Sequence, residues 1–157
     1  MNKVHYSSKS DEWETPLEFF QKYNDIYNFD IDVCATKDNA LCKKYWTKDD
    51  DALEEEWIGS CWMNPPYGRM IGKFIKKAYL ESLKKATVVC LIPSRTDTAY
   101  WHDFVMLGDV EFIRGRLKFI NRTFPSWRED GNFKVSPANF PSAVVVFKNQ
   151  KQAEKGN

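Results

Sequence analysis

The stretch CWMNPPYGRM, residues 61–70, joins an apolar run to two adjacent prolines. Neither proline can donate a hydrogen bond to a neighbouring strand, so a strand that runs through Met63 must end here. The prolines also fix their own backbone angles, which allows the side-chain oxygen of Asn64 and the carbonyl oxygen of Pro65 to face one small volume. The stretch predicts a stiff turn at a strand end, and that turn is either a plain strand exit or a reaction site.

The segments on both sides of this turn alternate between strand and helix patterns. Continuous apolar runs are typical of strands covered on both faces, whereas apolar residues spaced three and four apart are typical of helices. We expect strands at 29–33, 60–64, 87–93, 110–120 and 142–148, helices over about 16–26, 70–86 and 98–107, and a short helix or further strand at 40–46. This order predicts a three-layer α/β fold, with a mostly parallel sheet flanked by helices and an antiparallel hairpin at its end.

Three polar or turn-forming residues come where expected strands end. Ligands of such sheets bind at the carboxyl ends of the strands. We therefore expect Asp32, Asn64 and Pro93 to lie at one edge of the sheet.

The first helix has a start signal in ETPLE, residues 14–18. The Thr15 hydroxyl can cap the helix, Pro16 suits the first helical position, and Glu18 can close a capping box. This pattern predicts a helix that begins at Pro16.

Length and composition predict one domain over residues 1–157, with a core at about 10–148 and no separate target-recognition domain. The chain has no apolar run long enough to span a bilayer and no export signal, so we expect no membrane association and a cytoplasmic location. The cysteines form no C-x-x-C pair, which argues against a metal site and a disulfide framework. We expect plain buried thiols at Cys34, Cys42, Cys61 and Cys90.

Charge is unevenly spread over a chain whose net charge is only +1. Residues 38–56 are mainly acidic, whereas residues 114–134 are mainly basic. The basic flank is either part of an ordinary mixed surface or a local site for a polyanion. The long segment 121–139 interleaves basic and aromatic side chains, which suits a nucleic acid whose target base leaves the stack.

The turn after the 60–64 strand suits a planar substrate that carries an amino group. The oxygens of Asn64 and Pro65 can accept both amino hydrogens, Pro66 stiffens the turn, and the Tyr67 ring can stack on the substrate. In adenine the amino lone pair is delocalised into the ring. Two acceptors would turn that lone pair outward toward an electrophile, which is orientation and electrostatic work.

Seven segments carry a family resemblance, and they follow one another as DEWETP, DIDVCAT, DDDAL, NPPYG, LIPSRTDTAYWH, RGRLKF and FPSAVVVFK. From about residue 8 to residue 148 they resemble the phage-type DNA N-6-adenine-methyltransferase (Dam-like) family, whose members carry the NPPY tetrapeptide and use S-adenosylmethionine (AdoMet). The resemblance implies a single-domain Rossmann-like fold. It also implies methyl transfer to the 6-amino group of a flipped adenine in double-stranded DNA, without a metal.

The resemblance also implies roles for individual residues. Asp32 stands where the family places an acid for the methionine ammonium of AdoMet, although a turn cap is the alternative. Asp51 resembles the acid that contacts the nucleoside, with the register among the three aspartates left open. Trp13, Thr15 and Pro16 resemble the N-terminal motif beside the cofactor. DVCAT lacks the glycine-rich loop of many methyltransferases, so the cofactor contact can differ in detail.

Basic residues are the candidates for DNA contacts. Arg95 can bind a phosphate, the cofactor carboxylate or Asp97. The candidates for phosphate or loop contacts are Arg114, Arg116, Arg122, Trp127 and Arg128. The alternatives are an amino-methyltransferase for RNA or protein glutamine, since NPPY also occurs in glutamine methyltransferases, and a non-catalytic nucleic-acid-binding domain. Monomer and homodimer both stay open.

Overall fold

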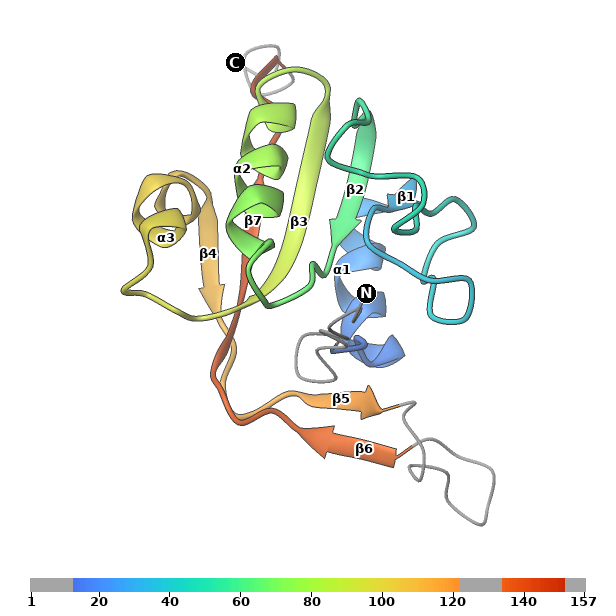
Figure 1. Cartoon of the computed structure of the whole chain (residues 1–157), viewed down its shortest axis with the longest axis vertical. Coiled ribbons are helices and arrows are strands. Elements are labelled where there is room, and N and C mark those ends of the chain that lie inside the picture. Colours follow the sequence, from blue (N-terminus) through green and yellow to red (C-terminus); the bar gives the residue numbers. More distant parts are fainter. Residues whose placement is uncertain (1–12, 122–133, 152–157) are drawn as a thin grey trace, which may run out of the picture.

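The computed structural model of the chain describes residues 13–121 and 134–151. A five-stranded sheet has the order β1-β2-β3-β7-β4 (Figure 1). Its strands are β1 (Ile31–Asp32), β2 (Gly59–Met63), β3 (Ala86–Pro93), β7 (Ser142–Phe147) and β4 (Asp109–Phe112). Strands β1, β2 and β3 are parallel, while β7 runs antiparallel to both β3 and β4. The prediction of an α/β fold with a mostly parallel sheet is therefore confirmed, and the Rossmann-like classification stays a prediction.

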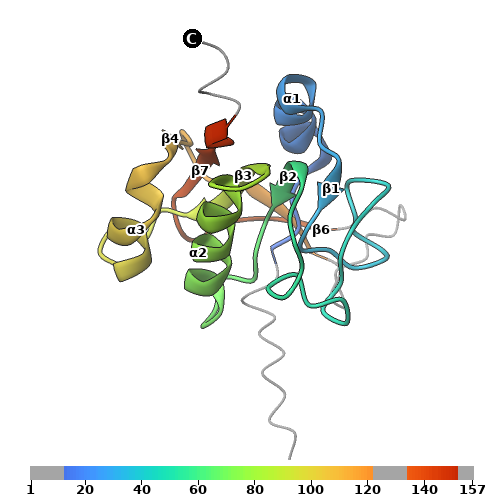
Figure 2. The ribbon, with the colours of Figure 1, turned by 90° about the horizontal axis from the view of Figure 1, so that it is seen from above.

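Helices cover both faces of this sheet, as Figure 2 shows. Helix α1 (Leu17–Tyr27) lies on one face, and helices α2 (Ile71–Ser82) and α3 (Ala99–Asp103) lie on the other. A short 3-10 helix, η1 (Val105–Leu107), follows α3. The three helical segments expected from apolar spacing are thus present, the last one broken at Phe104.

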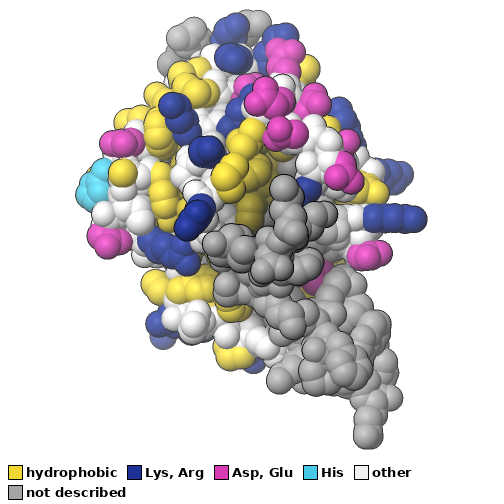
Figure 3. Space-filling model, in the orientation of Figure 1, with side chains coloured by type: hydrophobic (Ala, Val, Ile, Leu, Met, Phe, Trp, Pro, Cys, Tyr) yellow, Lys and Arg dark blue, Asp and Glu magenta, His cyan; other side chains and the backbone are white. Residues whose placement is uncertain are grey.

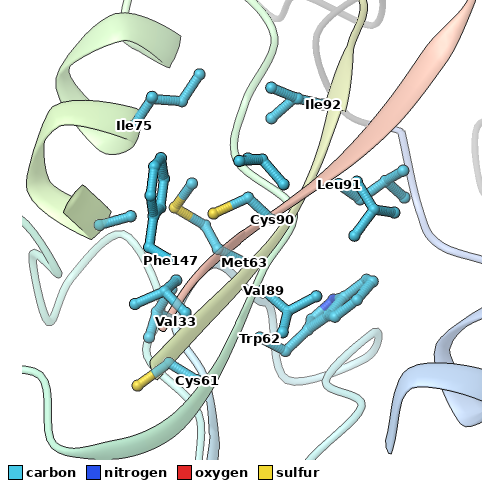
Figure 4. Close-up of a cluster of buried hydrophobic side chains, with 14 of the residues drawn as sticks. Val33, Cys61, Trp62, Met63, Ile75, Val89, Cys90, Leu91, Ile92 and Phe147 are labelled. Atoms are coloured by element: carbon cyan, nitrogen blue, oxygen red, sulfur yellow. The ribbon is translucent and has the colours of Figure 1, made fainter. Parts of the chain in front are cut away.

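The core lies between the layers because successive strand residues point to opposite faces. In Figure 4, Cys90 and Ile92 point to the α2 side, where Ile75 lies, whereas Val89 and Leu91 point to the α1 side. All five side chains have no exposed area. The continuous apolar run of β3 is therefore explained by burial on both faces.

The expected antiparallel pair at the end of the sheet is confirmed, because β7 pairs antiparallel with the edge strand β4. The expected single strand over 110–120 is wrong: β4 ends at Phe112, a turn at Gly115 has φ +77°, and β5 (Lys118–Asn121) begins beyond it. Glycine tolerates this left-handed angle, so it allows the chain to leave the sheet here.

Strand β5 pairs with β6 (Lys134–Pro137) in a separate two-stranded antiparallel sheet below the carboxyl edge (Figure 1). Part of the segment that we expected to be a loop over 121–139 is thus strand β6. Residues 122–133 lie outside the described part of the chain.

The long connection from β1 to β2 is mostly irregular. Segment 40–46 is neither a helix nor a full strand, because its only strand pairing with the described residues is an isolated bridge between Asp32 and Tyr45. Main-chain bonds from Asp32 N to Lys44 O and from Trp46 N to Asp32 O hold it against β1. This irregular connection forms one wall of the site described below.

Within residues 13–121 and 134–151, no helix is long and apolar enough to cross a membrane. The same residues contain no cluster of His, Cys, Asp and Glu side chains suited to a metal ion. Cys61 and Cys90 are buried thiols as predicted, but Cys34 and Cys42 are only partly buried because they lie in the irregular connection after β1.

Candidate active site at the carboxyl edge of the sheet

A cavity of about 800 Å³ lies at the carboxyl edge of the sheet. Asp32 ends β1 and Asn64 follows β2, and both line this cavity. Pro93 ends β3 at the same edge, as the parallel arrangement requires. The other walls come from the chain before α1 and from the segments 33–41 and 47–53. The volume is within the range of small-molecule sites, which runs from roughly 300 to 1,000 Å³.

The Asn64 side chain is held by two acceptors from the chain before α1. Its Nδ2 donates hydrogen bonds to the carbonyl oxygen of Trp13 and to Thr15 Oγ1, the latter over 2.9 Å. A carbonyl oxygen can only accept, so the atom beside Trp13 must be the amide nitrogen and not the amide oxygen. Asn64 Oδ1 is buried and has no hydrogen-bond partner among the described residues. A buried acceptor without a partner calls for an explanation, and a ligand donor would supply it.

The two prolines lie where the sequence predicts, but the tyrosine does not. Pro65 and Pro66 line the cavity. The open face that we expected Tyr67 to offer is not found: its side chain is 1% exposed, and its hydroxyl donates to the carbonyl oxygen of Leu91 over 3.3 Å. Phe119 and Phe140 pack edge-on around it, with ring centroids 6.4 and 5.6 Å away. Stacking of Tyr67 on a base therefore requires these two rings to withdraw.

Asp32 places a buried carboxylate on the cavity wall. It is 3% exposed, and it accepts hydrogen bonds from the backbone N–H groups of Cys34 and Leu41, both over 3.2 Å. Burial raises the pKa of Asp32 to about 7, since the two N–H groups only partly offset the loss of hydration. The described residues place no cation on this carboxylate. The site thus has an unmatched acid that favours a cationic ligand group.

The register among the three aspartates is clearer in the structure. Asp50 closes a turn, because its Oδ2 accepts from the Thr47 N–H over 2.8 Å. Asp49 and Asp51 line the cavity, and Asp51 has φ +50° within the same tight turn. Asp49 and Asp51 are thus both candidates for the predicted nucleoside contact, which stays a prediction.

The chain before α1 does not use its predicted cap. Pro16 is the N-cap residue of α1, and this helix end has no side-chain cap hydrogen bond. The capping role expected of Thr15 is wrong, because its hydroxyl accepts from Asn64 instead. Trp13 and Thr15 line the cavity, whereas Pro16 does not.

The structure describes only some of the residues that we predicted to contact nucleic acid. The Arg95 Nη1 donates to the carbonyl oxygen of Tyr67 over 2.7 Å, a partner that the sequence did not suggest. Arg114 and Arg116 are exposed on either side of Gly115. Arg122, Trp127 and Arg128 lie outside the described residues.

Acidic and basic side chains both lie on the face that Figure 3 shows. Acidic side chains lie over the connection into β2, where Glu54, Glu55 and Glu56 are exposed. Exposed basic residues include Lys73 and Lys76 on α2 and Arg69 in the turn before it.

Several residues of the site could not be found from the sequence. Leu41 and Cys34 contribute only backbone N–H groups to Asp32, and any residue type can do so. Phe119 and Phe140 enclose Tyr67 from elements that are far apart in the chain. Met70 and Phe74 complete the apolar wall.

Known proteins resemble this chain over different shares of its length. The sequence model of the family described as DNA N-6-adenine-methyltransferase (Dam) matches residues 3–155. A protein named DNA N-6-adenine-methyltransferase, from Haemophilus phage HP1, is 29% identical over 146 residues, which cover 89% of this chain and 80% of that protein. A putative methyltransferase named YfdM, from Escherichia coli K12, is 35% identical over 65 residues, or 36% of this chain and 71% of that protein.

Proposed function

The chain belongs to the DNA N-6-adenine-methyltransferase (Dam) family and is an adenine-specific DNA methyltransferase, and on this basis we propose how its residues hold the methyl donor and the base. The donor is AdoMet, and it occupies the cavity of about 800 Å³. The base is an adenine that leaves the duplex, since a paired and stacked amino group cannot reach such a site. One observation supports the proposal above the others: Asn64, which lines the cavity together with Asp32, has a buried side-chain oxygen without a partner among the described residues.

The residues of the cavity fit AdoMet in charge and in chemistry. Asp32 is a buried acid without a cationic partner among the described residues, and the ammonium group of AdoMet would supply that partner. Asp51 would accept hydrogen bonds from the ribose hydroxyls. Trp13 and Thr15 form the neighbouring wall, and Pro16 supports them from the start of α1. When bound, AdoMet supplies an electrophilic methyl group on a sulfonium centre.

Asn64 prepares the adenine amino group for methylation. Its Oδ1 accepts one amino hydrogen, and the carbonyl oxygen of Pro65 accepts the other. Pro65 and Pro66 limit the motion of this pair of acceptors because their backbone angles are fixed. Accepting both hydrogens turns the nitrogen lone pair out of the ring plane, and fixed acceptors do so without reorganisation at the moment of reaction.

Asn64 cannot take up the proton that the amino group releases on methylation, because a neutral amide is not basic. That proton therefore passes to water. Tyr67 stacks on the base in the DNA-bound state, once Phe119 and Phe140 have withdrawn.

Basic residues outside the cavity position the DNA. Arg114 and Arg116 contact phosphates beside the sheet edge, where they fix the register of the protein without reading sequence. Arg95 supports the NPPY turn through Tyr67 and adds positive charge. The loop residues Arg122, Trp127 and Arg128 contact the strand around the extruded base. One catalytic domain carries all of these roles.

The test uses plasmid DNA that lacks adenine methylation and AdoMet with a labelled methyl group. We expect label in DNA, and mass spectrometry of the digested nucleosides should identify N6-methyladenine, whose sequence context sequencing then maps. Equal amounts of RNA and of a protein mixture serve as parallel substrates. Label that enters only RNA or protein would contradict the proposal.

Asn64→Ala tests the assigned role directly. Methyl transfer should fall by about 100-fold or more, as on removal of a preorganised hydrogen-bonding group elsewhere, while AdoMet binding by calorimetry is retained. Asn24→Ala is the matched control, because it removes an asparagine that accepts one backbone N–H at the far end of α1. Full activity of Asn64→Ala would refute the role of this side chain.

A further inference from the structure

We propose that Thr15 is a positioning residue for Asn64 and that, together with the Trp13 carbonyl oxygen, it holds the catalytic amide as an acceptor-only group, selective for bases that carry an amino group. This inference rests on the proposed function. It assigns Thr15 to the amide, whereas the family resemblance places it in a motif beside the cofactor.

The hydrogen bonds of Asn64 leave one orientation for its amide. Both Nδ2 hydrogens are engaged, one by the carbonyl oxygen of Trp13 and the other by Thr15 Oγ1 at 2.9 Å. Rotating the amide by half a turn would place Oδ1 against the Trp13 carbonyl, and two acceptors repel each other. The oxygen is therefore the only group that Asn64 can offer to a substrate.

Thr15 is well placed to maintain this orientation. Its side chain is 5% exposed, so water has little access to compete for the hydroxyl. The hydroxyl also does not cap α1, because Pro16 is the N-cap residue and this helix end has no side-chain cap hydrogen bond. A capping hydroxyl stabilises a helix, and here the Thr15 hydroxyl accepts from Asn64 instead.

The backbone around Thr15 is anchored to the hairpin of β5 and β6. Glu14 forms an antiparallel bridge with Ile120, in which the Ile120 N–H donates to the Glu14 carbonyl oxygen over 3.1 Å. The Trp13 ring packs edge-on against Phe119, with centroids 5.4 Å apart. The two acceptors for Asn64 thus belong to a segment that is held on its other side by β5.

An acceptor-only amide discriminates between purines. The 6-amino group of adenine donates to Asn64 Oδ1, whereas the 6-oxygen of hypoxanthine would face it as a second acceptor. Removing the Thr15 hydroxyl leaves the Trp13 carbonyl oxygen as the one described partner of Nδ2, so the amide is held less firmly in the position that presents Oδ1. The discrimination against hypoxanthine should therefore weaken without Thr15.

The experiment compares Thr15→Val, which has the same shape but no hydroxyl, with Thr15→Ser, which keeps the hydroxyl. The substrate is a duplex oligonucleotide that carries the methylation context mapped on the plasmid. For Thr15→Val we expect kcat to fall by roughly 10- to 100-fold, as for a misplaced catalytic group, with KM for DNA and Kd for AdoMet within about twofold of the wild type. Thr15→Ser should recover most of kcat.

A second duplex, with hypoxanthine in place of the target adenine, competes for binding. The wild type should bind it more weakly than the adenine duplex, and Thr15→Val should narrow this difference by several-fold. If Thr15→Val instead raises the Kd for AdoMet and leaves kcat at saturation unchanged, Thr15 is a cofactor contact and the inference fails. Unchanged activity of Thr15→Val would also overturn it.

Asn64→Asp provides a test that does not depend on the folding of a Thr15 variant. It places a carboxylate oxygen where Nδ2 faces the Trp13 carbonyl, so kcat should fall although the shape is kept. Wild-type activity of Asn64→Asp would contradict the inference. If the wild type itself methylates no DNA, the proposed function fails, and that result is separate from all of these outcomes.

Discussion

Arg95 Nη1 donates a hydrogen bond to the carbonyl oxygen of Tyr67 over 2.7 Å. This bond joins the segment after β3 to the turn that follows β2. The two exits are neighbours because β2 and β3 are parallel and end at the same edge. The bond supports the NPPY turn just beyond its prolines. A charged donor on a carbonyl oxygen makes a stronger hydrogen bond than a neutral one.

Replacing Arg95 should separate this support from the positive charge. Arg95→Lys keeps the charge but loses the planar donor geometry, and Arg95→Met loses both. We expect kcat to fall by several-fold in both variants, because the turn is less well held. DNA affinity falls as salt concentration rises, and the slope of log affinity against log salt concentration reports the number of phosphate contacts. If Arg95 also contacts a phosphate, Arg95→Met should reduce the size of this slope by about one, and Arg95→Lys should leave it unchanged. Methyl-transfer kinetics and DNA binding at several salt concentrations measure the two effects. Wild-type kcat in both variants would show that the bond to Tyr67 has no part in activity.

The pKa of Asp32 predicts that AdoMet binding depends on pH. Burial raises this pKa to about 7 in the free protein, and a cation bound beside the carboxylate would lower it. The ionised form is the one that binds, so affinity should be highest above pH 7 and should fall as pH decreases, by at most about tenfold per unit. Calorimetry between about pH 5.5 and 7 is suitable, since an α-amino group stays protonated there. Asp32→Asn should bind weakly and without this pH dependence. An affinity of the wild type that does not change over this range would argue against a cation at Asp32.

Two glycines with the same backbone angle offer a matched pair for stability. Gly59 and Gly115 both have φ +77°. A Cβ on Gly59 would lie 2.3 Å from Asp30 Oδ2, whereas a Cβ on Gly115 would meet no atom of the described residues within 4 Å. Asp30 Oδ2 accepts from the Ser60 N–H over 2.9 Å, so moving it away forfeits that bond.

Both alanine variants should carry the strain of a left-handed angle, about 1–2 kcal/mol. Gly59→Ala should lose a further 0.5–1.5 kcal/mol or so from the displaced hydrogen bond. Urea denaturation measures the free energy of unfolding of each. Equal losses in the free energy of unfolding of the two variants would mean that Asp30 moves away without a further loss of stability.

Glu81 should contribute to stability as a buried acid with good partners. It is 2% exposed, its Oε2 accepts from the Trp57 N–H over 3.1 Å, and its Oε1 lies 2.8 Å from Lys77 Nζ. Although burial alone would raise the pKa of Glu81, the Lys77 ammonium and the Trp57 N–H hold it below its ordinary value of 4.5. Glu81→Ala should lower the free energy of unfolding by about 1.5–3 kcal/mol at pH 7, as expected for hydrogen bonds to a charged group.

The pH dependence of this effect has a definite sign. A lowered pKa in the folded state means that the charged form stabilises the protein above pH 4.5 or so, and that the contribution is lost as pH falls through the folded value. The difference between the wild type and Glu81→Gln should therefore shrink below about pH 4.5. Glu54→Gln, an exposed acid on the connection into β2, is the control and should change little. A difference that grows on acidification would contradict the assigned pairing.

The sequence alone determined the features that depend on neighbouring residues. Two prolines after an apolar run end β2 at Met63, since they lack the donor that a strand needs. Apolar spacing placed α1 and α2 within a few residues of their bounds. The order of strands and helices implied a mostly parallel sheet, and this placed Asp32 and Asn64 at one edge.

Only the tertiary structure decided which side chains meet there. Thr15 has the sequence signal of a helix cap, yet its hydroxyl serves Asn64, 49 positions away. Tyr67 has the position of an open platform, yet Phe119 and Phe140 enclose it. A hydroxyl or an aromatic ring can pair with several different partners equally well, and the local sequence indicates only the partners that are close in the chain. The choice is made by packing between segments far apart in the chain, which exists only once the sheet has formed.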